Sequence, residues 1–142
     1  MTDLKPRLAS FLTEIWTLGR LERIPLYLGD SYQIRHDPGD PWDGQTLTQQ
    51  GFRDRVAKSR AAAPDQVFTP VEMIQDDRRV AVAWTWRGTH LGDLPGFPAS
   101  GRKITMSGLT VYSFDGWDML VGHWQIADRL GVAQQLMQPA PA

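Results

Sequence analysis

The second half of the chain is dominated by long stretches in which side chains alternate between two characters. Four such stretches follow one another, over residues 67–77, 78–90, 102–116 and 117–128. In the second stretch, the period of two expected of a β-strand places on one face Val80, Val82, Trp84, Trp86 and His90. Turn residues at 76–79 and 115–116 join the stretches in pairs. The pattern therefore predicts two long hairpins, and with them an antiparallel sheet.

The first half of the chain has mainly helical spacing. Residues 4–19 place on one face Leu8, Phe11, Leu12, Ile15 and Trp16. A short second helix is expected over 21–28, and a third over 46–64, which Thr46 or Thr48 can cap and Pro64 stops. Between these helices, residues 31–36 alternate as a strand, and prolines and glycines make 37–44 a loop.

The order of these elements is helix, helix, strand, helix and then four long strands. It predicts an α+β fold in which the helices lie on one side of a mostly antiparallel sheet. A chain of 142 residues is expected to form one domain, over 1–142, with a single core. The sequence MQPAPA, at 137–142, is expected to be a flexible tail.

Composition excludes several classes of site and partner. A formal net charge of −1 gives no electrostatic reason to expect nucleic acid or an anionic membrane as partner. The chain has no cysteine, and its three histidines are too dispersed for a metal signature, so we expect no metal. No apolar run approaches the ~20 residues of a membrane span, and the first residues lack a signal-peptide core. A cytoplasmic protein is expected.

Asp128 stands between the last predicted strand and a closing helix over 129–137. Aspartate there is a favoured N-cap, which stabilises a helix by about 1 kcal/mol through bonds to free amides of the first turn. Alternation supports another interpretation, because Trp124, Ile126 and Asp128 share one parity. If the two apolar residues face the interior, the carboxyl does too, and burial would raise its pKa towards that of a general base. The residues alone favour the cap.

His90 ends its strand and precedes a glycine-rich loop over 91–101. It is either a rim histidine bonded to the backbone or a hydrogen-bond donor and acid/base at the mouth of a pocket. Because it shares a face with Trp84 and Trp86, all three are expected to face the same way. His123 has the parity opposite to Asp128, so together with Gln125 it is expected to meet solvent or a partner subunit.

His36 shares a face with Tyr32 and Ile34 in the strand over 31–36. In a pocket it could polarise a carbonyl oxygen, and at the surface it could pair with Asp37 or Asp40. The shared parity favours the pocket.

Three blocks of the sequence resemble the SnoaL-like polyketide cyclase family. They are RHDP (35–38), RGTHLGDLPGFPASGRKI (87–104) and GHWQIADRLGVAQQL (122–136). With the order of elements, the resemblance covers nearly the whole chain. This family belongs to the NTF2-like, ketosteroid-isomerase-like superfamily. The resemblance therefore implies a cone-shaped α+β barrel, in which a curved, mostly antiparallel sheet wraps around the N-terminal helices and leaves an apolar pocket open at one end.

The resemblance also implies a chemistry. The characterised cyclases of the family close a polyketide ring by intramolecular aldol condensation without metal or organic cofactor, so no cofactor is expected here. A carboxylate at the position of Asp128 is implied as the acid/base, with His90 and His36 as polar pocket groups. These three are the predicted catalytic residues. The predicted substrate-binding residues are Trp16, Tyr32, Trp84, Trp86, Trp124 and Ile126.

One scaffold hosts many activities in this superfamily, so other functions stay open. A non-catalytic module would use the same cone to hold a lipid or metabolite. Isomerisation or hydration needs a similar pocket carboxylate, but the Asp-Arg-Asp constellation of the epoxide hydrolase relatives cannot be assembled from the sequence. A hydrophobic small molecule is the expected ligand, with no nucleic acid and no membrane as partner. By analogy with the superfamily, we expect a homodimer through the exposed sheet face.

Overall fold

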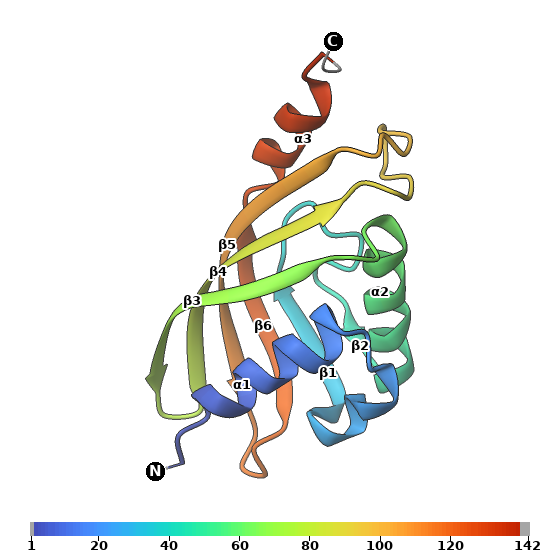
Figure 1. Cartoon of the computed structure of the whole chain (residues 1–142). Helices are drawn as coiled ribbons and strands as arrows, with labels where there is room; N and C mark the ends of the chain where they lie inside the picture. The colour runs from blue at the N-terminus through green and yellow to red at the C-terminus, as the bar shows by residue number, and fades with distance from the viewer. Residues whose placement is uncertain (1, 140–142) are drawn as a thin grey trace.

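The computed structural model describes residues 2–139, and one curved six-stranded sheet organises them (Figure 1). Its strands are β1 (Leu28–His36), β2 (Thr46–Leu47), β3 (Val67–Asp76), β4 (Arg79–Thr89), β5 (Lys103–Phe114) and β6 (Leu120–Ala127). Their order across the sheet is β2-β1-β6-β5-β4-β3. Every neighbouring pair is antiparallel except β1 and β6, which are parallel. The predicted α+β fold with a mostly antiparallel sheet is confirmed.

The helices gather mainly on one side of this sheet (Figure 1). An α-helix, α1 (Lys5–Phe11), continues into a π-helical segment, η1 (Leu12–Thr17), and a 3₁₀ segment, η2 (Leu21–Leu26), follows. The long helix α2 (Gln49–Ala62) lies beside β1, and α3 (Arg129–Met137) projects beyond the end of the sheet (Figure 1). The helical face predicted for 4–19 is buried in full, which places the core between α1, α2 and the concave sheet face.

Glycine 19 ends the first helical segment in a conformation that demands glycine. Its φ is +68°, and a Cβ there would collide with Nε of Arg60. The Arg60 guanidinium takes this space and donates to the carbonyls of Trp16 and Thr17, which the end of the helix leaves without partners. Arg60, a residue of α2, thereby fixes the end of η1 and with it the position of Trp16.

The elements differ from the sequence prediction mainly at their ends. Thr48 caps α2, accepting from the amide of Gly51 at 3.0 Å, whereas Thr46 belongs to β2 and pairs with β1. The β5–β6 connection is longer than the predicted two-residue turn. The predicted tail, 137–142, begins within α3, and its residues 140–142 lie outside the described residues. Pro70 is accommodated because β3 is an edge strand with a register shift beside it.

Candidate functional site

A cavity of about 400 Å³ lies between the concave face of the sheet and the helices. Most of its wall is apolar, and its aromatic lining is Trp16, Trp42, Phe52, Phe68, Trp84, Trp86 and Phe97. Side chains of α3 and of the loop over 91–101 complete the wall. One part of the wall carries a group of polar side chains, namely Tyr32, Asp40, Arg55, Tyr112, His123, Gln125 and Arg129, and the other polar lining residues are Lys58, Ser59, His90 and Asp93. An apolar cavity of this size with few polar groups is typical of a small-molecule site.

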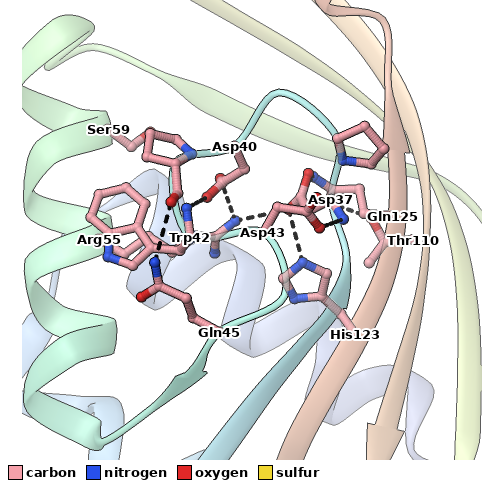
Figure 2. Close-up of polar contacts among 12 residues, drawn as sticks. Asp37, Asp40, Trp42, Asp43, Gln45, Arg55, Ser59, Thr110, His123 and Gln125 are labelled. Carbon is pink, nitrogen blue, oxygen red and sulfur yellow. Dashed lines mark hydrogen bonds and ion pairs between the residues drawn. The ribbon is translucent and has the colours of Figure 1, made fainter.

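Asp37 is the centre of this polar group, although it does not line the cavity itself. Its side chain is fully buried directly after β1, and it accepts hydrogen bonds from four side chains, among which Figure 2 draws Arg55, His123 and Gln125. The donors are His123 Nε2 at 2.9 Å, Arg55 Nη2 at 3.1 Å, Arg129 Nη2 at 3.0 Å and Gln125 Nε2 at 3.2 Å. All four donors face the cavity. Asp37 therefore acts as an anchor that holds four polar side chains in the cavity wall. We call Asp37 and these four donors the Asp37 cluster.

A chain of hydrogen bonds from the sheet fixes how Gln125 is oriented. The indole Nε1–H of Trp84 can only donate, so Thr110 Oγ1 accepts from it at 2.9 Å. The Thr110 hydroxyl then donates to Gln125 Oε1 at 2.6 Å. The amide nitrogen of Gln125 therefore faces Asp37 and donates to it, because a carboxylate can only accept hydrogen bonds. Three strands thus cooperate to present one amide to the anchor.

The hydrogen-bond partners of His123 also determine which ring nitrogen carries its proton. Its Nε2 lies 2.9 Å from Asp37 Oδ2, and its Nδ1 lies 2.6 Å from the hydroxyl of Tyr32. Burial lowers the pKa of His123, against the opposing effect of the Asp37 hydrogen bond, so the ring is neutral at pH 7. The one ring proton is on Nε2, because a carboxylate needs a donor. Nδ1 therefore accepts the proton of the Tyr32 hydroxyl, and both ring nitrogens are occupied.

Charges in the cluster balance one another. Burial raises the pKa of Asp37, but the hydrogen bond from His123 and the charge of Arg55 outweigh it, and the net shift is downward. Burial lowers the pKa of Arg55, but the charge and hydrogen bond of Asp40 outweigh it, and the net shift is upward. Both groups are therefore ionised at neutral pH despite their burial.

Arg55 bridges two aspartates, so the structure assembles an Asp-Arg-Asp constellation that the sequence analysis could not. Its Nη2 lies 3.1 Å from Asp37 Oδ2 and 3.0 Å from Asp40 Oδ2 (Figure 2). Its guanidinium carbon lies 5.1 Å from the ring centroid of Trp16, which covers one face of the cation. Among residues 2–139, none bonds to Arg55 Nε, and no bond is formed by Nη1. Unused guanidinium donors of the cluster among residues 2–139 are therefore Nε and Nη1 of Arg55, together with Nη1 of Arg129.

The predicted inward direction of Asp128 is wrong. Trp124 and Ile126, which share its parity, are 45% and 48% exposed. His123 and Gln125, which were predicted to meet solvent or a partner subunit, face inward and line the cavity. Alternation gave the correct grouping of side chains but not which group faces inward. Asp128 is the N-cap of α3, with Oδ1 accepting from the amide of Gly131 at 2.9 Å, and it does not line the cavity.

His36 also lies outside the cavity, for a different reason. Tyr32 and Ile34 are buried as predicted, but the pairing of β1 with β6 shifts register between Ile34 and His36. The shift turns His36 onto Trp124, where the two rings stack at 4.4 Å between centroids and 10° between planes. Asp37, rather than His36, thus becomes the inward residue at the end of β1.

His90 is buried and lines the cavity, as predicted for a pocket residue. Its Nδ1 lies 2.8 Å from the hydroxyl of Ser100, in the loop that follows β4. Within the described part of the chain, its Nε2 is buried without a hydrogen-bond partner. A buried polar atom without a partner costs about 1–3 kcal/mol, and in the described part of the cavity wall this applies to His90 Nε2 as well as to Arg55 Nε.

The predicted substrate-binding residues divide into two groups. Trp16, Tyr32, Trp84 and Trp86 line the cavity, and Gln66 holds two of them, through Trp16 O at 2.8 Å and Trp86 Nε1 at 3.3 Å. Trp124 and Ile126 lie on the outer face and do not line it. Contact of the first group with a substrate stays a prediction.

Asp37, Arg55 and Arg129 were not predicted as site residues, and His123 and Gln125 were predicted on the wrong face of their strand. One signal was present in helix α2, where Arg55 lies three residues after Phe52 and next to Val56, on the buried face. An arginine on an apolar helix face needs a buried anion, and Asp37 directly after a strand is a candidate. The arrangement around Asp37 brings together residues up to 92 positions apart, which no local pattern indicates.

Stability should depend on pH through His123 before it depends on Asp37. As pH falls below about 6.5, the unfolded chain protonates this histidine while the folded chain resists, so the free energy of unfolding decreases. A further decrease is expected below about 3.9, where Asp37, Glu14 and Asp65, all with lowered pKa values, lose their stabilisation. Urea unfolding at a series of pH values measures both steps. In His123→Gln the first step should be smaller, and an unchanged first step would contradict the assignment.

Residues 2–139 lack two further features. No group of three or more histidine, aspartate or glutamate side chains is arranged to hold a metal ion. No helix is long and apolar enough to cross a membrane.

Comparison with known families and structures agrees on one family. The model of the SnoaL-like polyketide cyclase family matches residues 6–136. A crystal structure from Acidithiobacillus ferrooxidans, named as a candidate polyketide cyclase, is 47% identical with a TM-score of 0.91, covering 98% of this chain and 97% of that chain. No match was found among the curated proteins.

More distant solved structures share the fold. IdmH of Streptomyces antibioticus, named as a candidate polyketide cyclase, is 24% identical with a TM-score of 0.78, covering 95% of this chain and 99% of that chain. TsrD of Streptomyces laurentii is 19% identical with a TM-score of 0.80, covering 96% of this chain and 98% of that chain.

Proposed function

The chain belongs to the SnoaL-like polyketide cyclase family, and we propose that it catalyses cofactor-independent acid/base chemistry on a hydrophobic, carbonyl-bearing small molecule. The reaction would be an intramolecular aldol cyclisation or a related isomerisation. The observation that carries this proposal is the Asp37 cluster, which places polar side chains in one part of the wall of an otherwise apolar cavity.

The chemistry needs a group that stabilises negative charge on the carbonyl oxygen when the neighbouring carbon loses a proton. Arg55 supports this role, because it lines the cavity, is ionised and has Nε and Nη1 donors that no residue among 2–139 uses. In a site with little water, a fixed cation stabilises an enolate more than it does in water. His90, with its unpartnered Nε2, remains a candidate proton-transfer group in the same wall.

Exchange of α-protons tests the proposal without knowledge of the natural substrate. β-Tetralone is a compact bicyclic ketone, and nuclear magnetic resonance in deuterium oxide follows replacement of its α-protons. The wild-type protein is expected to accelerate exchange over buffer, and Arg55→Lys to reduce it. Asp128→Asn keeps a good N-cap and is expected to leave both exchange and stability nearly unchanged. Loss of exchange in Asp128→Asn would instead support the predicted acid/base role of Asp128.

The same assay separates catalysis from binding alone. Trp16, Trp84 and Trp86 line the cavity, so their fluorescence reports a ligand that enters it. If β-tetralone and larger aromatic ketones bind while exchange equals that of buffer, the non-catalytic binding module is the better account.

Addition of water is a second candidate reaction, and one observation favours it. The arrangement of Asp37, Arg55 and Asp40 resembles the Asp-Arg-Asp constellation of the epoxide hydrolase relatives. Styrene oxide is a suitable probe, since its hydrolysis to a diol is followed by chromatography. Hydrolysis that depends on Asp40, without exchange of ketone α-protons, would favour hydration over cyclisation.

We further propose that the protein forms a homodimer through the outer face of the sheet. Leu109, Trp124 and Ile126 are each close to half exposed there, and Leu109 pairs directly with Ile126. Light scattering coupled to size exclusion should give twice the chain mass of 16.0 kDa. Ile126→Lys should shift the mass towards the monomer, and a monomeric wild-type protein would rule the proposal out.

A further inference from the structure

Three buried side chains of the cavity wall form one line of hydrogen bonds. The Tyr32 hydroxyl lies 2.6 Å from His123 Nδ1, and His123 Nε2 lies 2.9 Å from Asp37 Oδ2. Tyr32 and His123 are 1% and 2% exposed, and Asp37 is fully buried. The arrangement has the logic of a nucleophile, a histidine base and a carboxylate that orients it, with a phenol in the first place.

The direction of the protons along this line follows from the anchor. Asp37 is ionised, so it accepts the Nε2–H of His123, and Nδ1 accepts the O–H of Tyr32. Gln125 also donates to Asp37, through the amide nitrogen that the hydrogen-bond chain from Trp84 turns towards it, so the two side chains share the carboxylate as donors. The tautomer with the proton on Nε2 is therefore built into the wall.

Free hydrogen-bonding capacity indicates that the Tyr32 oxygen is the atom that contacts a substrate. His123 lines the cavity, but both of its nitrogens are occupied. Tyr32 also lines the cavity, and its oxygen donates one proton while keeping lone pairs that can accept another. The ring is held by Phe52 in an edge-on contact at 4.9 Å between centroids. Of the three side chains, only Tyr32 combines a position in the cavity wall with a free lone pair.

We propose that Tyr32 is the catalytic base of this cavity and that His123 and Asp37 are positioning residues that relay its proton. This inference rests on the proposed function. In the step, the C–H bond beside the substrate carbonyl breaks and its proton goes to the Tyr32 oxygen. The Tyr32 O–H proton passes to His123 Nδ1, and the electron pair of the C–H bond moves into an enolate whose oxygen Arg55 stabilises. Asp37 stays ionised and holds the imidazolium through Nε2–H. Return of the protons along the same line neutralises the aldol alkoxide.

Because His123 must be neutral to accept the proton, the relay fails once His123 is protonated. The titratable and charged groups around His123 are Tyr32 on β1, Asp37 and Asp40 after it, Arg55 on α2, Tyr112 on β5 and Arg129 on α3. Burial lowers the pKa of His123 more than Asp37 raises it. The exchange rate should therefore be constant through neutral pH and fall only below about 6.5.

Exchange of β-tetralone α-protons tests the relay with Tyr32→Phe, which removes one hydroxyl and keeps the ring. The rate is expected to fall at least about a hundredfold, in line with loss of a general base. Tyr27→Phe is the matched control, since its hydroxyl bonds to Glu14 and it does not line the cavity. The control should retain the wild-type rate. His123→Gln should lower the rate to a similar extent, and the double variant with Tyr32→Phe should be no slower, because the residues act as a unit.

The outcomes separate the relay from the proposed function. Exchange that is fast in the wild type and persists in Tyr32→Phe overturns the relay and leaves the function standing, with His90 as the next candidate. Additive losses in the double variant also overturn the relay. Wild-type exchange equal to buffer overturns both. Nitrogen-15 shifts of His123 are an independent readout: a proton on Nδ1 at pH 7 contradicts the relay whatever the rates show.

Discussion

Replacing Arg55 with methionine is expected to lower the free energy of unfolding by about 3–5 kcal/mol, because it removes one partner of a buried ion pair. Arg55 is 6% exposed and bonds Asp37 and Asp40 through one nitrogen. Without it, the buried Asp37 carboxylate loses its buried cation and must either stay charged with only the half-exposed Arg129 beside it or take up a proton. Urea unfolding measured by tryptophan fluorescence gives the value.

Arg129→Met is the matched control for this loss. Arg129 also donates a hydrogen bond to Asp37, at 3.0 Å, but its side chain is 37% exposed. Water can therefore replace part of the hydrogen bonding and charge stabilisation that Arg129 gives to Asp37. A loss of about 1 kcal/mol is expected. Equal losses in the two variants would show that burial of Arg55 adds nothing, which contradicts the description of the cluster as a buried ion pair.

Replacing Asp37 with asparagine is expected to cost a similar amount, about 3–5 kcal/mol, for the opposite reason. The isosteric amide leaves Arg55 and Arg129 short of an anion. The amide also places an NH₂ group where the carboxylate accepted hydrogen bonds from donors that include His123 Nε2 and Gln125 Nε2, so a donor faces a donor. The free energy of unfolding at pH 7, again from urea unfolding, measures the effect.

A double-mutant cycle tests whether the two losses have one cause. Asp37→Asn combined with Arg55→Met removes both charges, so the double variant should lose less than the sum of the single losses, by about 1–3 kcal/mol. Asp43→Asn provides a control for the loop, since within residues 2–139 the Asp43 side chain accepts one hydrogen bond, from the backbone amide of Asp37. Additivity within about 0.5 kcal/mol would mean that Asp37 and Arg55 contribute separately.

The sheet and most helices could be predicted because their signals are local. Alternation over β4 identified a face that is buried along its whole length. Thr48, one of the two cap residues predicted from the sequence, is the N-cap of α2. The short strand β2 could not be found in this way. Its two residues are strand only because they pair with β1, and their sequence continues the helical pattern of α2.

The site was harder to predict because it depends on which face of a strand turns inward. In β6, the parity that carries Trp124 and Ile126 is the more apolar, yet the inward parity carries His123 and Gln125. Those polar side chains can be buried only because Asp37 and Thr110, on other strands or at their ends, satisfy them. The register shift in β1 that brings Asp37 inward arises from pairing with β6, which no stretch of sequence encodes alone. For His90 the sequence left a rim position and a pocket position open, but the face that it shares with Trp84 and Trp86 was predicted correctly, since the pairing of β4 with β5 has no such shift.

A crystal structure with bound β-tetralone tests most directly whether the Asp37 cluster is the functional site. The ketone is expected in the aromatic cavity, with its carbonyl oxygen within hydrogen-bond distance of Arg55 and its α-carbon beside the Tyr32 oxygen. A ketone bound on the outer face beside Asp128, or in the cavity with its carbonyl turned away from the Asp37 cluster, would show that the cluster is not the functional site.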